Sequence, residues 1–368
     1  MRLEGVELRR VALPLVSPFR TSLGTQTVRD ALLVRVVTDE GEGWAECVAE
    51  DEPTYCPEYL EGAADVIRRF LLPALFPIEL DPAAVAPAFQ HLRAHQMAKS
   101  AVETAVLDAW LRARDMSLAA YLGAVRRSLP VGVSIGIKDT VDELLDTVDR
   151  SLADGYARVK LKIEPGWDLE PVGRVRETFG ADVMLTVDAN TAYGLSDIVH
   201  LTRLDAYGLA MIEQPFAPGD LYAHARLAAR MSTPICLDES ITSARDAVAA
   251  IRQDACSIIN IKPGRVGGYL EARRIHDVAH ANGLPVWCGG MLETGLGRAA
   301  NLALAALPGF TLPGDISATA RYYERDVTAP FTLSGGEMAV PTGAGIGIEP
   351  DRSSLEALTT ATEWIPAP

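Results

Sequence analysis

The apolar and polar positions alternate most clearly at residues 157–163, Ala-Arg-Val-Lys-Leu-Lys-Ile. In an extended chain this pattern puts the aliphatic side chains on one face and Lys160 and Lys162 on the other, so it predicts a β-strand. A solvated edge strand would explain the pair of lysines on its own. In a strand covered by helices, both ammonium groups would instead lie in the interior, where they need compensating groups.

Single charged residues then recur at a nearly constant interval. Asp188, Glu213, Asp238 and Lys262 follow Lys162 at successive steps of 26, 25, 25 and 24 residues, each at the C-terminal end of a short apolar run. Such an interval accommodates one strand, one helix and two loops. A parallel α/β barrel gathers these strand ends at one mouth, so the five charged side chains are expected to meet there.

The rest of the chain predicts an α+β capping domain, an α/β barrel and a tail that rejoins the cap. The expected boundaries are 1–125, 126–318 and 319–368. In the cap we expect strands at 6–13, 31–38 and 43–48, with turns at Gly24 and Gly41, and helices at 58–72, 82–95 and 97–114. In the barrel we expect a first strand at 129–136, a seventh at 285–293 and an eighth at 310–315.

Composition narrows the class of protein. The 368 residues are 48% hydrophobic, which suffices for a large core, and the net charge of -15 argues against nucleic acid or an anionic membrane as partner. No N-terminal signal pattern and no apolar run of spanning length are present, so we expect a cytoplasmic protein. The five cysteines have no paired spacing and are expected to be free thiols.

Weaker motifs have mainly structural interpretations. The glycines of 342–347 lack a following helix, which predicts a loop rather than a dinucleotide site. The pairs His91 and His95, and His276 and His280, are spaced for metal binding but are expected to lie on solvated helix faces. The segment 264–268 either cradles a phosphate at a helix start or forms a flexible turn beside Lys262.

The recurring charges suggest proton-transfer chemistry. Asp188, Glu213 and Asp238 form an oxygen-only set that suits a hard divalent ion and leaves positions open for substrate. Lys162 and Lys262 on flanking strands can exchange a proton with the α-carbon of a carboxylate substrate. We expect Lys160 to weaken proton binding by Lys162 through charge repulsion, and Arg265 to act similarly beside Lys262.

At these motifs the sequence resembles the enolase superfamily, muconate-lactonizing-enzyme subgroup, and within it the o-succinylbenzoate synthase / N-succinylamino acid (N-acylamino acid) racemase family. The resemblance covers essentially the whole chain. The motifs that carry it are Lys160-Leu-Lys162, Asp188-Ala-Asn190, Glu213-Gln-Pro215, Asp238-Glu-Ser240, Ile261-Lys-Pro-Gly-Arg265 and Trp287-Cys-Gly-Gly-Met291.

The resemblance implies a capping domain over a modified (β/α)₇β barrel, with Mg²⁺, or Mn²⁺ or Co²⁺ in its place, on the three carboxylates. It implies Lys162 and Lys262 as the acid/base pair, Glu239 as a further group that tunes them, and loops 19–24 and 48–56 that close over the substrate. It also implies a homo-oligomer, a dimer or octamer. The substrate contacts that it implies are Phe19, Tyr55, Ser134, Lys160, Asn190, Gly290, Met291, Leu292 and Tyr322.

The acidic loop Glu50-Asp51-Glu52 departs from the family, whose members commonly place a methionine or small residues there, so the acyl or side-chain preference stays open. Two activities fit the site equally: racemisation of N-succinyl or N-acyl amino acids, and dehydration to o-succinylbenzoate in menaquinone biosynthesis. Mandelate-type enzymes place a histidine opposite the lysine, and dipeptide epimerases carry Asp-x-Asp where this chain has only Gly314-Asp315. A silent carboxylate binder does not need two lysines, and a Schiff-base aldolase does not need three carboxylates.

Overall fold

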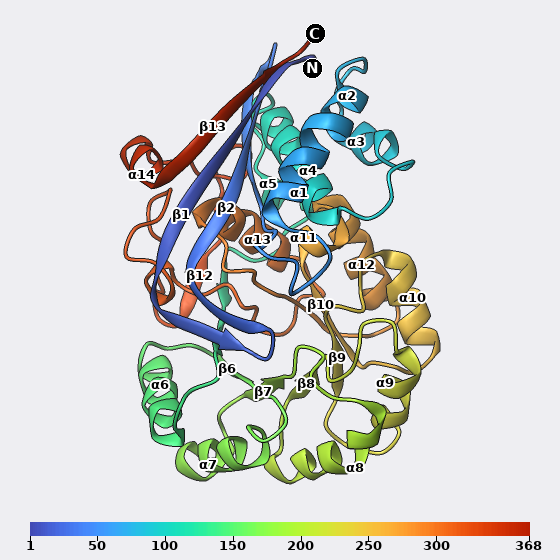
Figure 1. Ribbon diagram of the computed structural model, residues 1–368, viewed down its shortest axis with the longest axis vertical. Coiled ribbons are helices and arrows are strands. Elements are labelled where there is room, and N and C mark those ends of the chain that lie inside the picture. The colour runs from blue at the N-terminus through green and yellow to red at the C-terminus, as the bar shows by residue number, and fades with distance from the viewer.

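The computed structural model describes the whole chain, residues 1–368, as a cap above a curled parallel sheet (Figure 1). The cap contains a four-stranded antiparallel sheet in the order β13-β1-β2-β3. Its strands are β1 (Leu3–Thr21), β2 (Gly24–Thr38), β3 (Gly41–Cys47) and β13 (Thr359–Pro366). The turns at Gly24 and Gly41 are confirmed, but β1 and β2 extend well beyond the predicted strands. Their extension is a two-stranded ribbon, which resumes pairing at Phe19 after a register shift that begins at Pro14.

The helices of the cap differ from the prediction in two places. The first helical region continues past Pro73, as a π-helical turn, η1, followed by a short helix. The second helix ends at Ala88 rather than at His95. The third is confirmed within two residues. These elements are α1 (Leu60–Val66), η1 (Ile67–Leu71), α2 (Leu72–Leu75), α3 (Pro82–Ala88), α4 (Gln96–Arg112) and α5 (Leu118–Leu122).

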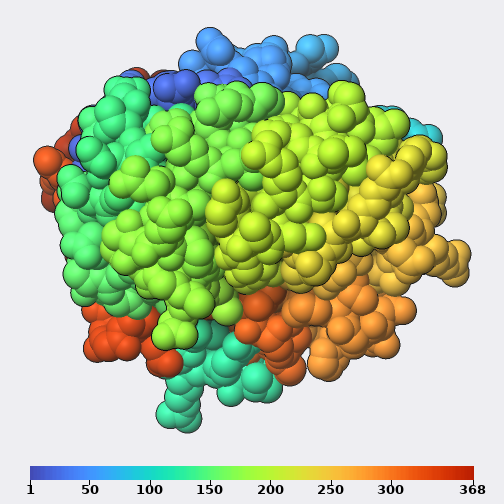
Figure 2. Space-filling model, turned by 90° about the horizontal axis from the view of Figure 1, so that it is seen from below, coloured from blue at the N-terminus to red at the C-terminus, as the bar shows by residue number.

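The predicted succession of barrel strands is confirmed as a seven-stranded parallel sheet in the order β11-β10-β9-β8-β7-β6-β5. Its strands are β5 (Gly132–Ile135), β6 (Arg158–Lys162), β7 (Leu185–Asp188), β8 (Met211–Glu213), β9 (Ile235–Leu237), β10 (Ile258–Ile261) and β11 (Val286–Cys288). Helices cover the outer face, and Figure 2 shows several of them from below as one continuous surface. They are α6 (Val141–Ala153), α7 (Leu169–Phe179), α8 (Ile198–Leu201), α9 (Leu221–Ala228), α10 (Ala244–Arg252), α11 (Pro263–Val266), α12 (Tyr269–Ala281) and α13 (Gly295–Ala305), with the 3-10 turns η2 (Leu195–Asp197) and η3 (Thr202–Tyr207).

The predicted eighth strand at 310–315 is wrong as a regular strand. The segment lies between β11 and β5 and makes only single bridges, Val286 with Phe310 and Val131 with Gly314. Pro313 has no N–H to donate, which prevents a continuous ladder across this gap. Backbone bonds from Asp315 to Cys288 and from Gly132 to Gly314, at 2.9 and 2.7 Å, still connect both edges of the sheet.

The tail returns to the cap, as predicted, because β13 pairs with β1 along its length. On the way it forms η4 (Thr319–Arg321), β12 (Glu337–Ala339), which pairs with β4 (Ser128–Pro130), and α14 (Arg352–Leu358). The segment 342–347 is a loop, as expected. None of the helices combines the length and the apolar composition that a membrane span requires.

Two of the weaker predictions are corrected. His276 is buried, not solvated, because its ring stacks on Phe310 and accepts the N–H of Gly309 at 3.0 Å. A phosphate cannot sit at the start of α12, because the carboxylate of Glu103 already accepts the N–H groups of Tyr269 and Leu270 there. The segment 264–268 is therefore the end of the short helix α11 and the turn that joins it to α12, next to Glu103 of α4.

Gly43 tests how closely β3 packs on α4. A Cβ atom at this position would lie 2.2 Å from the carbonyl oxygen of Ala105 and 2.3 Å from the nitrogen of Ala109, both in the helix backbone. We expect Gly43→Ala to lower the free energy of unfolding by about 2 kcal/mol in urea denaturation. Gly219→Ala, which meets open space, should change it by no more than about 0.5 kcal/mol. Equal values for the two variants would contradict this packing.

Candidate active site

The register of the parallel strands brings the charged strand ends together. Lys162 lies opposite Asp188, and Asp188 lies opposite Glu213, in the pairs β6–β7 and β7–β8. Asp238 and Lys262 directly follow β9 and β10. All five side chains are buried, as are Lys160, Glu239 and Arg265. The constant interval in the sequence thus corresponds to one layer of charge at the mouth of the barrel.

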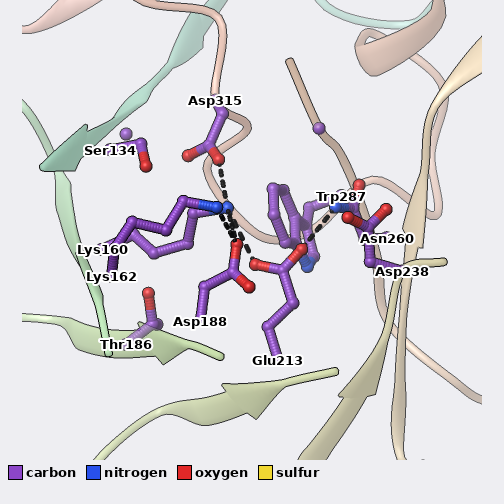
Figure 3. A network of polar contacts seen from close by, with 12 residues as sticks. Ser134, Lys160, Lys162, Thr186, Asp188, Glu213, Asp238, Asn260, Trp287 and Asp315 are labelled. Carbon is purple, nitrogen blue, oxygen red and sulfur yellow. Dashed lines mark hydrogen bonds and ion pairs between the residues drawn. The ribbon is translucent and has the colours of Figure 1, made fainter. Parts of the chain in front are cut away.

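Lys160 lies at the centre of a group of three carboxylates (Figure 3). Its Nζ is 3.1 Å from Asp188 Oδ2, 2.8 Å from Glu213 Oε2 and 2.6 Å from Asp315 Oδ2. The same Nζ lies 4.8 Å from the centre of the Trp287 ring, a cation–π contact. Burial alone would lower the pKa of Lys160, but the carboxylates, Asp315 first, raise it above its usual value. Lys160 is therefore held as a cation.

Lys162 contacts Asp188, one of the carboxylates that Lys160 also contacts. Its Nζ donates to Asp188 Oδ2 at 2.7 Å and to Asn190 Oδ1. Asp188 Oδ2 thus lies within 3.1 Å of both lysines. The shared carboxylate attracts both charges and so opposes the repulsion between Lys160 and Lys162 that the sequence led us to expect. Burial would raise the pKa of Asp188, but Lys162 and Lys160 hold it below its usual value.

Lys262 faces the same mouth from β10, four strands from β6 in the curled sheet. Its Nζ donates to Asp238 Oδ2 at 2.8 Å and to the hydroxyl of Tyr55 at 3.2 Å. Burial would lower the pKa of Lys262, but Tyr55 and the carboxylates around it raise the pKa above its usual value. The side chain of Tyr55 therefore brings the capping loop into contact with the second lysine.

Arg265 holds Asp238 rather than touching Lys262. Its Nη1 donates to Asp238 Oδ1 and, at 3.2 Å, to the Tyr55 hydroxyl, while its other nitrogens bond to the backbone oxygens of Ile241 and Asn260. Arg265 and Lys262 thus share two partners, Asp238 and the hydroxyl of Tyr55. Glu239 is tied to the site by Asn190 Nδ2 at 3.0 Å, and burial, followed by the charge of Asp188, raises its pKa to about 7.

The donor set of Asp188, Glu213 and Asp238 suits a hard divalent ion, since it consists of carboxylate oxygens at three neighbouring strand ends. In this structure the three do not form a ligating cluster, and cationic side chains bind their oxygens instead. Glu239 Oε2, which is buried beside them, has no hydrogen-bond partner. The residues present therefore fit a cation in donor chemistry.

A cavity of about 370 Å³ lies between this charge layer and the cap. Its walls include the loop at 50–55, the ribbon end at 19–30 and the residues that follow β11. Phe19 and Tyr322 meet there edge to face, with ring centres 6.1 Å apart. Every substrate contact expected from the resemblance lines this one cavity: Phe19, Tyr55, Ser134, Lys160, Asn190, Gly290, Met291, Leu292 and Tyr322.

Four residues that follow barrel strands adopt left-handed backbone conformations, which are unfavourable for residues other than glycine. They are Asn190, Thr191, Gln214 and Leu292, with φ of 40°, 66°, 37° and 55°. Gln214 gains hydrogen bonds in return, because its Oε1 accepts the N–H of Asp238 at 2.9 Å and that of Ser240 at 3.2 Å. The strained backbone at Gln214 thus helps to hold the segment that carries Asp238.

The sequence prediction did not include several members of the site. Asp315 pairs with Lys160 and Arg158, Asn260 donates to Glu213 Oε1 at 2.7 Å, and Trp287 packs against the cations. Asp315 was detectable, because it ends the predicted eighth strand and so continues the pattern of one charge for each strand end. Asn260 carries no charge, and no pattern distinguished it from core residues. Trp287 belongs to a motif of the family resemblance, but the sequence assigned it no contact of its own.

The fold and the charged strand ends define a class of protein. Residues 4–123 match the model of the mandelate racemase / muconate lactonizing enzyme N-terminal domain, and residues 143–354 match that of the enolase C-terminal domain-like family. The chain belongs to this family of the enolase superfamily, as the sequence motifs indicated, and it is an enzyme.

Individual relatives narrow the comparison. The chain is 61% identical to an N-succinylamino acid racemase of Amycolatopsis sp over 99% of this chain and 100% of the relative. It is 46% identical to an o-succinylbenzoate synthase of Geobacillus kaustophilus over 98% and 96%. A crystal structure of an enolase-superfamily member from Listeria innocua superposes with a TM-score of 0.96 at 41% identity and covers 100% of both chains.

Asp315 is the only carboxylate that forms an ion pair with the buried Arg158. We expect Asp315→Asn to lower the free energy of unfolding by about 3 kcal/mol, because it leaves a buried cation without its counter-charge. Glu164→Gln, which breaks a more exposed pair with Arg20, should cost at most about 1 kcal/mol. Urea denaturation measures both, and a loss for Asp315→Asn no larger than that for Glu164→Gln would contradict the assigned charge balance.

Proposed function

We propose that this enzyme racemises N-succinyl or N-acyl amino acids by moving the α-proton between two lysines. The observation that carries the proposal is the placement of Lys162 and Lys262. They lie on strands four positions apart in a curled sheet, line the same cavity and each contact a carboxylate of the same charge layer. The 61% identity to an N-succinylamino acid racemase over the full chain supports the same reaction.

In the proposed reaction, the lysines and the cap have separate roles. One lysine removes the proton from one face of the α-carbon, and the other returns a proton to the opposite face. Lys160, held as a cation by its carboxylates, offers a fixed positive charge to the substrate carboxylate. The cap covers the cavity and limits the access of water. Ser22 of the cap holds it in place there, because its hydroxyl donates to the backbone oxygens of Ala189 and Asn190 beside the site.

A divalent ion, Mg²⁺ by preference, is proposed on Asp188, Glu213 and Asp238. When bound, it would stabilise the negative charge that develops on the substrate carboxylate as the α-proton leaves. The carboxylates would then exchange part of their contacts with the lysines for contacts with the ion. Removing those contacts would also free Lys162 and Lys262 to take part in proton transfer.

Dehydration to o-succinylbenzoate is the second candidate, supported by the 46% identity to an o-succinylbenzoate synthase. Both reactions begin with removal of the proton next to a carboxylate, so the same lysines and carboxylates serve either. Paired assays of the purified protein with Mg²⁺, on N-succinyl amino acids and on the dehydration substrate, decide between the two. Turnover of neither substrate would refute both proposals.

The first prediction from the proposed function concerns its dependence on a metal ion. We expect EDTA to abolish activity and Mg²⁺, Mn²⁺ or Co²⁺ to restore it, because the three carboxylates are ligands for one hard ion. Calorimetry with Mn²⁺ should show at least about tenfold weaker binding for Glu213→Gln, which replaces a charged ligand with a neutral one. Glu42→Gln on the cap surface serves as the control. Full activity in excess EDTA would rule out the metal.

The two lysines give the sharpest test of mechanism. We expect Lys162→Ala and Lys262→Ala each to abolish racemisation. Inversion needs one lysine to remove the proton from one face and the other to return a proton to the opposite face. Each variant should still exchange the α-proton of one enantiomer with deuterium from D₂O, and the two variants should act on different enantiomers. Proton NMR measures this exchange. If both variants exchange both enantiomers at the wild-type rate, another group is the base.

The acidic loop gives a prediction about the amino-acid side chain. Glu50, Asp51 and Glu52 all line the cavity, and burial, followed by the charge of Asp51, raises the pKa of Asp30 in the same wall. We expect this negative wall to disfavour acidic substrate side chains and to favour basic or neutral ones. Glu50→Met should shift relative kcat/KM towards hydrophobic side chains across a substrate panel. Unchanged ratios would show that Glu50 does not contact the side chain.

A further inference from the structure

The cavity is lined by five cationic side chains, and four of them pair with carboxylates. The paired ones are Lys160, Lys162, Lys262 and, through Asp326 at 3.2 Å, Arg298. The fifth, Arg29, is 2% exposed and forms no ion pair. A guanidinium is always charged, and burying it without a counter-charge is unfavourable. Arg29 is therefore an unbalanced cation at the wall of the active site.

The strand β2 determines where Arg29 lies. Side chains two residues apart share a face of a strand, so Arg29 lies on the same face as Ala31 and Leu33. Ala31 and Leu33 belong to the core that the cap shares with the barrel, which includes Leu161 and Ile261. The side chain of Arg29 is therefore directed from the cap sheet towards the barrel, on the side where the cavity lies.

The free nitrogens of Arg29 form a binding edge. Nη1 donates to the backbone oxygen of Ala49 at 3.2 Å, which fixes the orientation of the guanidinium. Nε and Nη2 are buried and have no hydrogen-bond partner. These two nitrogens form the side-on edge of a guanidinium, whose parallel N–H groups match the two oxygens of a carboxylate.

Glu46, on the neighbouring strand β3, bonds to Thr294 rather than to Arg29. Its Oε2 accepts from the backbone nitrogen of Thr294 at 2.8 Å and from the Thr294 hydroxyl at 2.6 Å, and its Oε1 has no partner. It forms no ion pair with Arg29, and burial raises the pKa of Glu46 to about 7 although the charge of Arg29 acts to lower it. Glu46 therefore leaves the Nε and Nη2 groups of Arg29 unoccupied.

We infer that Arg29 binds the distal carboxylate of a succinyl group through Nε and Nη2. The inference rests on the proposed function, in which the proximal carboxylate of the substrate is held by Lys160 and the charge layer. A succinyl substrate has a second carboxylate, and Arg29 is the cavity cation with no acidic partner. Arg29 is thus a specificity-determining residue that favours succinyl over neutral acyl groups.

Calorimetry with two achiral ligands tests this without requiring turnover. In the presence of Mg²⁺, we expect the wild-type enzyme to bind N-succinylglycine at least about tenfold more tightly than N-acetylglycine. Arg29→Gln should reduce that ratio to about one, because it removes the charge and the paired donors. Arg35→Gln, on the same strand but paired with the partly exposed Glu42, should retain the wild-type ratio.

The outcomes separate the inference from the proposed function. A wild-type enzyme that racemises nothing, yet shows a succinyl preference that Arg29→Gln abolishes, would refute the function and support the subsite. A ratio unchanged in Arg29→Gln, an equal loss for both ligands, or no binding of N-succinylglycine to the wild type would each overturn the inference. If Arg29→Gln does not fold, Arg29→Lys decides: it keeps the charge but not the paired donors, and its ratio should fall at least about threefold. An unchanged ratio in Arg29→Lys would then overturn the inference.

Discussion

The structure depends on the neutralisation of charge inside a barrel. Five strand ends deliver three carboxylates and two ammonium groups into a region that excludes water, and none of these groups could be buried alone. Asp188 neutralises part of this charge, since its Oδ2 lies within 3.1 Å of the Nζ atoms of both Lys160 and Lys162. Asp315 and Arg265 complete the balance from either side. Such a layer holds reactive groups in fixed positions and is ready to exchange its internal contacts for those of a substrate.

The cap contributes what the barrel lacks. The barrel supplies the charged groups on short, rigid strands, but nothing on those strands can close the cavity from above. The end of the β1–β2 ribbon and the loop at 50–55 provide that wall. Tyr55 connects the two regions chemically, because its hydroxyl contacts Lys262, Arg265 and, at 3.4 Å, Asp238. Tyr55 thereby links the position of the cap to the buried charges of the barrel.

This division of labour agrees with relatives whose names describe different reactions. The racemase of Amycolatopsis sp and the synthase of Geobacillus kaustophilus both align with nearly the whole chain. Under the proposed function, the same charge layer serves either reaction. The walls of the cavity, where the acidic loop at 50–52 and Arg29 lie, are where we propose that substrates are selected.

The sequence by itself determined the barrel and its charge layer. The period of two at 157–163 and the spacing of about 25 residues reflect local geometry, one strand and one helix for each step, so the ends of β6 to β10 could be located without coordinates. Tertiary structure decided what depends on distant segments. The segment 310–315 closes the barrel without forming a strand, because its partners are the two edges of the sheet and Pro313 interrupts the pairing. The contact of Tyr55 with Lys262, 207 residues away, and the unbalanced charge of Arg29 follow from the packing of the cap on the barrel, which no local pattern encodes.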